Sequence, residues 1–221
     1  MTNRRVFIAE LQDLTNEVIC MGNALEIMIS KVEKTIKEGN IALANEVVES
    51  DDLIDAMECK IERECIELIA KQQPVASDLR RVSACMRLIG DMERIGDHCA
   101  DICEYVGYIA EANMKIDNPE FYRMFEEMRF MVHNTIKCFA KEDVELAAVV
   151  MAADDVVDGI FASEVVQIKN MIKEDPRKVE YGVNYLLILK YIERMADHAG
   201  NIAEWVQYLV NGKLEEAMLA E

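Results

Sequence analysis

The stretch DMERIGDHCADICEYV at residues 91–106 decides the fold, because YIERMADHAGNIAEWV at residues 191–206 repeats it without a gap. The recurring positions are Glu93, Arg94, Asp97, His98, Ile102 and Glu104, which return as Glu193, Arg194, Asp197, His198, Ile202 and Glu204. An earlier pair, SDDLID at 50–55 and ADDVVD at 153–158, recurs in the same order. We therefore predict a duplicated unit, with the first repeat in residues 1–114 and the second in residues 115–221.

Apolar residues recur at helical spacing through almost the whole chain, which predicts helices rather than strands. We expect six helices, at about residues 5–38, 41–71, 77–113, 119–141, 143–173 and 176–212. The breaks between them carry capping residues and prolines, at Gly39-Asn40, Gln72-Gln73-Pro74, Asn118-Pro119 and Asp175-Pro176. Because these connections are short, neighbouring helices should pack antiparallel. The predicted fold class is all-α, with two tandem, structurally similar three-helix bundles.

The composition excludes several classes of protein. The sequence has 42 acidic residues against 24 basic ones, a formal charge of −18, so nucleic acid and anionic lipid surfaces should repel it. The N-terminal segment meets Glu10 and Asp13 before any long apolar run, and no uncharged stretch is long enough to span a bilayer. We expect a cytoplasmic protein without direct membrane insertion. Seven cysteines without a CxxC pair suggest neither a disulfide framework nor a zinc ribbon.

Acidic residues form a stripe along the predicted third helix. With Glu93 as the reference, Asp97, Asp101 and Glu104 fall at roughly 40°, 80° and 20° around the helix axis, so four carboxylates share one face. The second helix carries a similar stripe, formed by Asp51, Asp55, Glu58 and Glu62. Antiparallel packing could bring the two stripes together.

Two facing rows of carboxylates need a counter-charge, because like charges four residues apart destabilise a helix by about 0.2–0.5 kcal/mol per pair. A divalent or trivalent cation would supply it, and oxygen ligands favour Mg²⁺, Mn²⁺, Ca²⁺ or oxidised iron. A solvated acidic face is the alternative for any single motif, but the duplication favours metal. Asn201 replaces the acidic residue found at Asp101, so we expect fewer ions or looser binding in the second repeat.

The residues beside the stripes are assigned supporting roles. His98 and His198 turn about 100° away from the preceding aspartates, so packing or capping is expected of them rather than metal ligation. Arg94 and Arg194 are expected to pair with carboxylates.

These features resemble the PhoU family over essentially the whole chain. The resemblance is carried by the two three-helix repeats, the ERIGDH-type segment that occurs twice, and KQQPVASDLR at residues 71–80. It implies metal clusters on the repeated acidic motifs, which map onto Asp51, Asp55, Glu93, Asp97 and Asp101 in the first repeat and Asp154, Asp158, Glu193, Asp197 and Asn201 in the second.

The same resemblance implies a function without catalysis. Proteins of this family look like negative regulators of phosphate uptake, thought to connect the ATPase of a phosphate ABC transporter with a membrane sensor histidine kinase, and hence to control transcription through two-component signalling. A homodimer is expected, since dimers are common among proteins of this kind.

Other classes of function remain open at this point. The DDxxD motifs at 51–55 and 154–158 resemble those of all-helical prenyl diphosphate synthases, but the sequence AMECKIERE after the first motif lacks their basic residues. A Mg²⁺-dependent nucleotide pyrophosphohydrolase is a second enzyme alternative. A ferritin-like di-iron protein would need Glu-x-x-His motifs, which are missing here. A metal-free scaffold would explain the helices but not the repeated carboxylates.

Overall fold

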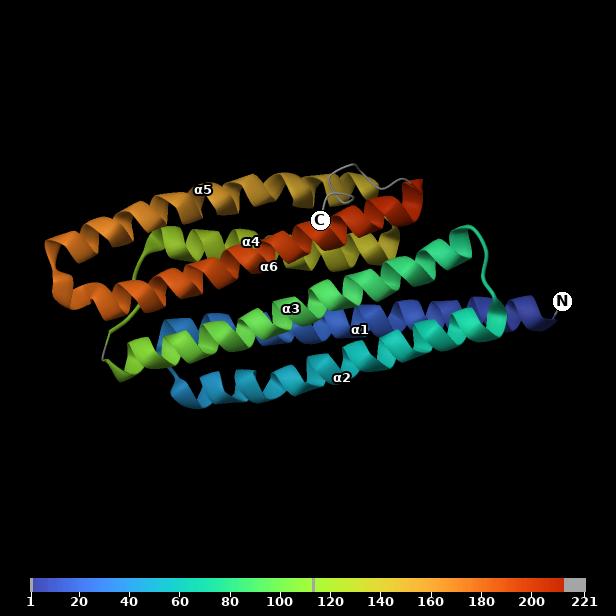
Figure 1. Cartoon of the computed structure of the whole chain (residues 1–221), viewed down its shortest axis with the longest axis horizontal. Coiled ribbons are helices and arrows are strands. Elements are labelled where there is room, and N and C mark those ends of the chain that lie inside the picture. The colour runs from blue at the N-terminus through green and yellow to red at the C-terminus, as the bar shows by residue number, and fades with distance from the viewer. Residues whose placement is uncertain (1, 113, 213–221) are drawn as a thin grey trace.

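The computed structural model describes residues 2–112 and 114–212, and within them the chain is all-helical (Figure 1). The long helices are α1 (Thr2–Glu38), α2 (Ile41–Gln72), α3 (Ser77–Glu111), α4 (Pro119–Lys141), α5 (Val144–Glu174) and α6 (Val179–Asn211). A short 3₁₀ turn, η1 (Pro176–Lys178), precedes α6. The predicted all-α class and the six helices are confirmed.

The breaks between helices follow the capping signals in the sequence. Gly39 adopts a left-handed conformation with φ of 62°, which ends α1 at low steric cost because glycine has no Cβ. The Asn40 side chain then accepts a hydrogen bond from the backbone N–H of Leu43 at 3.1 Å, which caps α2. Asn118 caps α4 in the same way, through the N–H of Glu120 at 3.0 Å.

The last helix begins slightly later than the approximate start predicted at residue 176. Asp175 accepts a hydrogen bond from the N–H of Arg177, and the N–H of Lys178 donates to the Asp175 carbonyl at 3.0 Å. This bond reaches back only three residues, so the segment forms a 3₁₀ turn and α6 starts at Val179. At the other end of the chain, α1 begins at Thr2 rather than at residue 5, since no helix-breaking residue intervenes.

The two repeats form two three-helix bundles that lie side by side with their helices along the long axis of the molecule (Figure 1). Helices α1, α2 and α3 pack together in one bundle, and α4, α5 and α6 pack together in the other. The bundles meet chiefly through α3 and α6, and to a smaller extent through α1 and α4. The buried side chains of both bundles form one continuous apolar core.

The close approach of α1 and α4 depends on Gly22. A Cβ atom at this position would lie 2.7 Å from Cγ1 of the buried Ile136, so a larger residue would force the two helices apart. Along the described ranges, no helix combines the length with the apolar character needed to cross a membrane.

Candidate metal centre

The antiparallel packing of α2 and α3 brings the two acidic stripes of the first repeat together. Asp51 and Asp55 on α2 and Asp97 on α3 each offer a carboxylate oxygen, and these three atoms lie within 4.8 Å of one another. Asp51 and Asp97 are half-buried, whereas Asp55 is exposed. Over residues 2–112 and 114–212, this is the one group of at least three such ligands that meets this spacing. We call these three residues, together with Glu93 and Asp101, the first acidic cluster.

Gly96 is the reason that Asp51 can lie so close to α3. A Cβ atom at Gly96 would be 2.9 Å from Asp51 Oδ1 and 3.1 Å from Ile54 Cγ2, which is closer than normal packing allows. Asp51 Oδ1 is itself buried and has no hydrogen-bond partner. A buried acceptor without a donor is costly, and a cation is the kind of ligand that would satisfy it.

The electrostatics of the first acidic cluster also favour a bound cation. Burial, together with the negative charges of Asp97, Asp55 and Glu93, raises the pKa of Asp51 from 3.8 to about 7. Burial and the charge of Asp97 also raise the pKa of Glu93, although Arg94 opposes this effect. Without a cation, Asp51 therefore retains its proton to a higher pH than an isolated carboxyl group would.

Arg94 supplies part of the counter-charge from the outer side of the cluster. Its Nη1 lies 2.7 Å from Asp97 Oδ2, and its Nε lies 3.3 Å from Glu93 Oε2. The Arg94 side chain is 59% exposed, so solvent screens these ion pairs. The expectation that Arg94 pairs with carboxylates is confirmed.

The second repeat gathers carboxylates in the corresponding place, between α5 and α6. Burial, together with the charges of Asp197, Asp158 and Glu193, raises the pKa of Asp154 from 3.8 to about 6. Asp154 Oδ1 is also buried without a hydrogen-bond partner. We call Asp154, Asp158, Glu193 and Asp197 the second acidic cluster.

Asn201 and Asp101, which occupy equivalent positions in the two repeats, make different contacts. The Asn201 side chain donates a hydrogen bond to Asp91 Oδ1 at 3.2 Å, so its amide is engaged at the joint between α6 and α3. Asp101 lies 3.3 Å from Nδ1 of His98, and its charge still contributes to the raised pKa of Asp51. Asp101 therefore belongs to the first acidic cluster and also reaches the joint between the bundles.

The two motif histidines pack at this joint, as the sequence predicts. The rings of His98 and His198 are 5.6 Å apart, and the ring of Tyr191 is 5.3 Å from that of His98. His98 is buried, and this burial lowers its pKa. His198 Nδ1 lies 2.9 Å from Asp91 Oδ1, the same oxygen that Asn201 contacts. Asp91 is thus a central residue that the sequence analysis missed.

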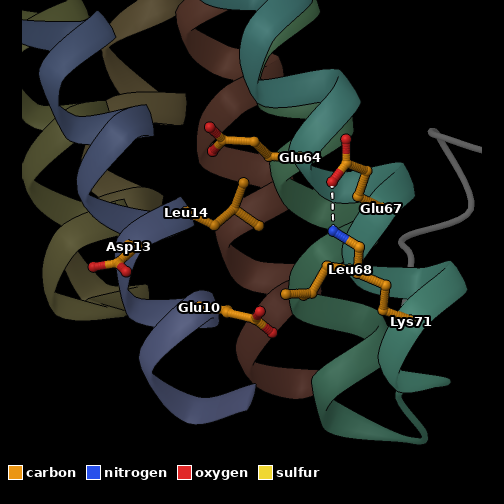
Figure 2. A pocket seen from close by; sticks show the side chains of 7 residues that line it. All are labelled: Glu10, Asp13, Leu14, Glu64, Glu67, Leu68 and Lys71. Carbon is orange, nitrogen blue, oxygen red and sulfur yellow. Dashed lines mark hydrogen bonds and ion pairs between the residues drawn. The ribbon is translucent and has the colours of Figure 1, made fainter. Parts of the chain in front are cut away.

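A separate cavity of about 230 Å³ lies between α1 and α2 (Figure 2). Its walls are formed by Glu10, Asp13, Leu14, Glu64, Glu67, Leu68 and Lys71. The Lys71 ammonium donates to Glu67 at 2.7 Å, as the dashed line in Figure 2 shows. None of these wall residues belongs to either acidic cluster, so this cavity is distinct from the candidate metal centre.

Comparison with known proteins places the chain in a family. The family described as "PhoU domain" matches it twice, over residues 18–106 and 121–206. A phosphate-specific transport system accessory protein PhoU homolog from Clostridium acetobutylicum is 30% identical, over 95% of this chain and 96% of its own length. The corresponding homolog from Pseudomonas aeruginosa is 32% identical, over 93% of this chain and 86% of its own length.

Solved structures agree with these sequence relationships. The crystal structure of PhoU from Pseudomonas aeruginosa superposes with a TM-score of 0.89 at 32% identity, covering 94% of this chain and 100% of that one. The phosphate transport system regulatory protein PhoU from Streptococcus pneumoniae also gives a TM-score of 0.89, at 26% identity, covering 95% of this chain and 99% of that one.

The fold and the double match define a tandem-repeat, all-helical protein whose relatives are named as accessory and regulatory proteins. The chain belongs to the PhoU family. The resemblance drawn from the sequence is confirmed, and so is the expectation of a non-enzymatic family.

Proposed function

We propose that this protein is a metal-binding, cytoplasmic negative regulator of phosphate uptake. In this role it couples the ATPase of a phosphate ABC transporter to a membrane sensor histidine kinase, and thereby controls transcription. Membership of the PhoU family supports the regulatory part, because the relatives are named as accessory proteins of phosphate-specific transport systems.

The metal part is carried by the spacing of Asp51, Asp55 and Asp97, whose oxygens lie within 4.8 Å of one another. These residues would hold the ion, with Glu93 and Asp101 beside them. Their hard oxygen atoms suit Mg²⁺, Mn²⁺, Ca²⁺ or iron. A bound cation supplies positive charge that the carboxylates share, and it offsets the burial and the repulsion that together raise the pKa of Asp51.

In this proposal the metal stiffens the contact between α2 and α3 and so fixes the shape of the surface that partners recognise. The second acidic cluster plays the corresponding part between α5 and α6, with a smaller charge and weaker metal binding. Asn201 contributes through its contact with Asp91 rather than as a strong ligand, since its amide already donates to that residue. The protein acts as a homodimer, which presents each docking surface twice.

Elemental analysis of metal per chain tests the proposal first. The wild type is compared with an Asp97→Ala, Asp197→Ala double variant and with an Asp52→Ala control, which removes an exposed neighbouring carboxylate. We expect metal in the wild type and the control but not in the double variant, at equal helicity by circular dichroism. Equal metal content in all three proteins would contradict the assignment of the site.

Capture experiments and a reporter of phosphate-uptake genes test the regulatory part. We expect the wild type to bind the purified transporter ATPase and the cytoplasmic part of the kinase, and to repress the reporter, whereas the double variant loses repression. Normal repression by a metal-free double variant would remove metal from the mechanism and leave a metal-free scaffold. Failure of the wild type to bind either partner would refute the coupling role.

A further inference from the structure

Lys190 lies on the same face of α6 as the carboxylates of the second acidic cluster. With Glu193 as the reference, Lys190 falls at roughly 60° around the helix axis and Asp197 at roughly 40°. The Lys190 ammonium contacts the carboxylate of Glu193, one turn further along the helix. The Glu193 side chain is only 12% exposed, so this ion pair is shielded from solvent on the carboxylate side.

A second contact fixes Lys190 against the opposite helix. Its Nζ atom lies 5.5 Å from the ring centroid of Phe161, a partly buried residue of α5. A cation over an aromatic face is attracted by the negative potential of the ring. The ammonium is therefore held between α5 and α6, at the edge of the second acidic cluster, by two independent contacts.

The first repeat has no such cation at the equivalent place. The gapless alignment of residues 91–106 with 191–206 continues one position back, where Gly90 corresponds to Lys190. A Cβ atom built on Gly90 would meet nothing within 4 Å, so the space beside the first acidic cluster is open. The offset that aligns Asp55 with Asp158 also aligns Glu58 with Phe161. Where the first repeat has the carboxylate of Glu58, the second repeat therefore has the aromatic ring of Phe161, and where the first has Gly90, the second has the cation of Lys190.

We propose that Lys190 is a built-in counter-ion of the second acidic cluster, which balances part of its negative charge in place of a metal ion and so leaves the first acidic cluster as the tighter metal site. This inference rests on the proposed function, because it treats both clusters as sites for positive charge. An ammonium beside Glu193 neutralises one carboxylate and repels an incoming divalent ion. The two repeats then share one fold but differ in their dependence on metal.

Titration with Mn²⁺, followed by electron paramagnetic resonance of the free ion, tests this inference. Lys190→Met keeps the aliphatic stem over Phe161 but removes the positive charge. We expect this variant to bind additional Mn²⁺ at the second acidic cluster, at least about tenfold more tightly than the wild type does there. Adding Asp197→Asn to this variant should abolish the gain. In the reverse direction, Gly90→Lys should weaken Mn²⁺ binding at the first acidic cluster, and the open space at Gly90 makes this variant easy to accommodate.

Thermal unfolding in a chelator gives a readout that does not depend on the wild type holding metal. Lys190→Met should lower the melting temperature in the chelator, because the carboxylates lose their counter-charge, and Mn²⁺ should restore it. Two results would overturn the inference. One is Mn²⁺ binding by Lys190→Met that is unchanged from the wild type, whether or not the wild type binds ions. The other is a wild type that loses its most tightly bound ions when only Asp197→Asn is introduced.

The experiment also separates this inference from the proposed function. A wild type without bound Mn²⁺ together with a Lys190→Met variant that binds it would refute the metal site of the first cluster and support the role of Lys190. Mn²⁺ binding at the first acidic cluster of the wild type, with no change in Lys190→Met, would support the proposed metal site and refute the role of Lys190.

Discussion

Replacing Asp51 with Asn tests the electrostatics of the first acidic cluster most directly. The pKa of Asp51 rises from 3.8 to about 7 on folding, so the folded chain holds a proton that the unfolded chain releases. Stability from this proton is fully present below about pH 4 and is lost as the pH rises through about 7. The rise corresponds to at most about 4 kcal/mol. Because Asp51 is only partly buried, we expect about 2 kcal/mol after solvent screening.

Urea unfolding in a chelator measures this effect. Asparagine mimics the protonated carboxyl group, so Asp51→Asn should be about 2 kcal/mol more stable than the wild type at pH 8, with the difference vanishing near pH 4. Saturating Mn²⁺ should reverse the order at pH 8, because only the wild type retains the ligand. Asp52→Asn, at an exposed neighbouring position, should leave the pH profile unchanged. A stability difference between Asp51→Asn and the wild type that is independent of pH would refute the reasoning.

Two further substitutions test the packing around the clusters. Gly96→Ala should destabilise the protein by about 1–3 kcal/mol and weaken Mn²⁺ binding, because the new methyl group displaces Asp51. An unchanged urea midpoint and an unchanged Mn²⁺ affinity would show that the methyl group fits between α2 and α3 without displacing Asp51. Asp91→Ala should cost about 1–3 kcal/mol, because His198 and Asn201 lose their shared acceptor, whereas Asp91→Asn should recover part of this loss. Equal unfolding free energies for the two Asp91 variants would contradict the role of that oxygen.

Much of the fold could be predicted from the sequence because its signals are local. Helical spacing of apolar residues and the capping side chains of Asn40 and Asn118 act within a few residues, and the structure follows them. The 3₁₀ turn at Pro176 escaped prediction, since proline at the start of a helix and proline in a tight turn look alike in sequence. The difference lies in where two backbone N–H groups donate: Lys178 to the Asp175 carbonyl and Val179 to the Pro176 carbonyl.

The candidate site could be predicted only in part. The acidic stripes follow from helix geometry, and the meeting of Asp51 with Asp97 follows from antiparallel packing. The contacts of Asp91 could not be foreseen, because they depend on which face of α3 the second bundle covers. Lys190 could have been found by extending the repeat alignment by one residue, but its contact with Phe161 depends on the rotation of α5 against α6.

The contacts between the two bundles give the protein three natural spectroscopic probes. The sequence holds only three histidines, and each touches a second segment of the chain. His98 and His198 face each other across the joint, and His133 on α4 lies 2.8 Å from Glu26 on α1. Their imidazole proton resonances fall in an uncrowded part of the spectrum, so they can follow the contact between the halves without isotope labels. Because Asp101 touches His98, the spectrum of that ring also records events at the first acidic cluster from within the joint.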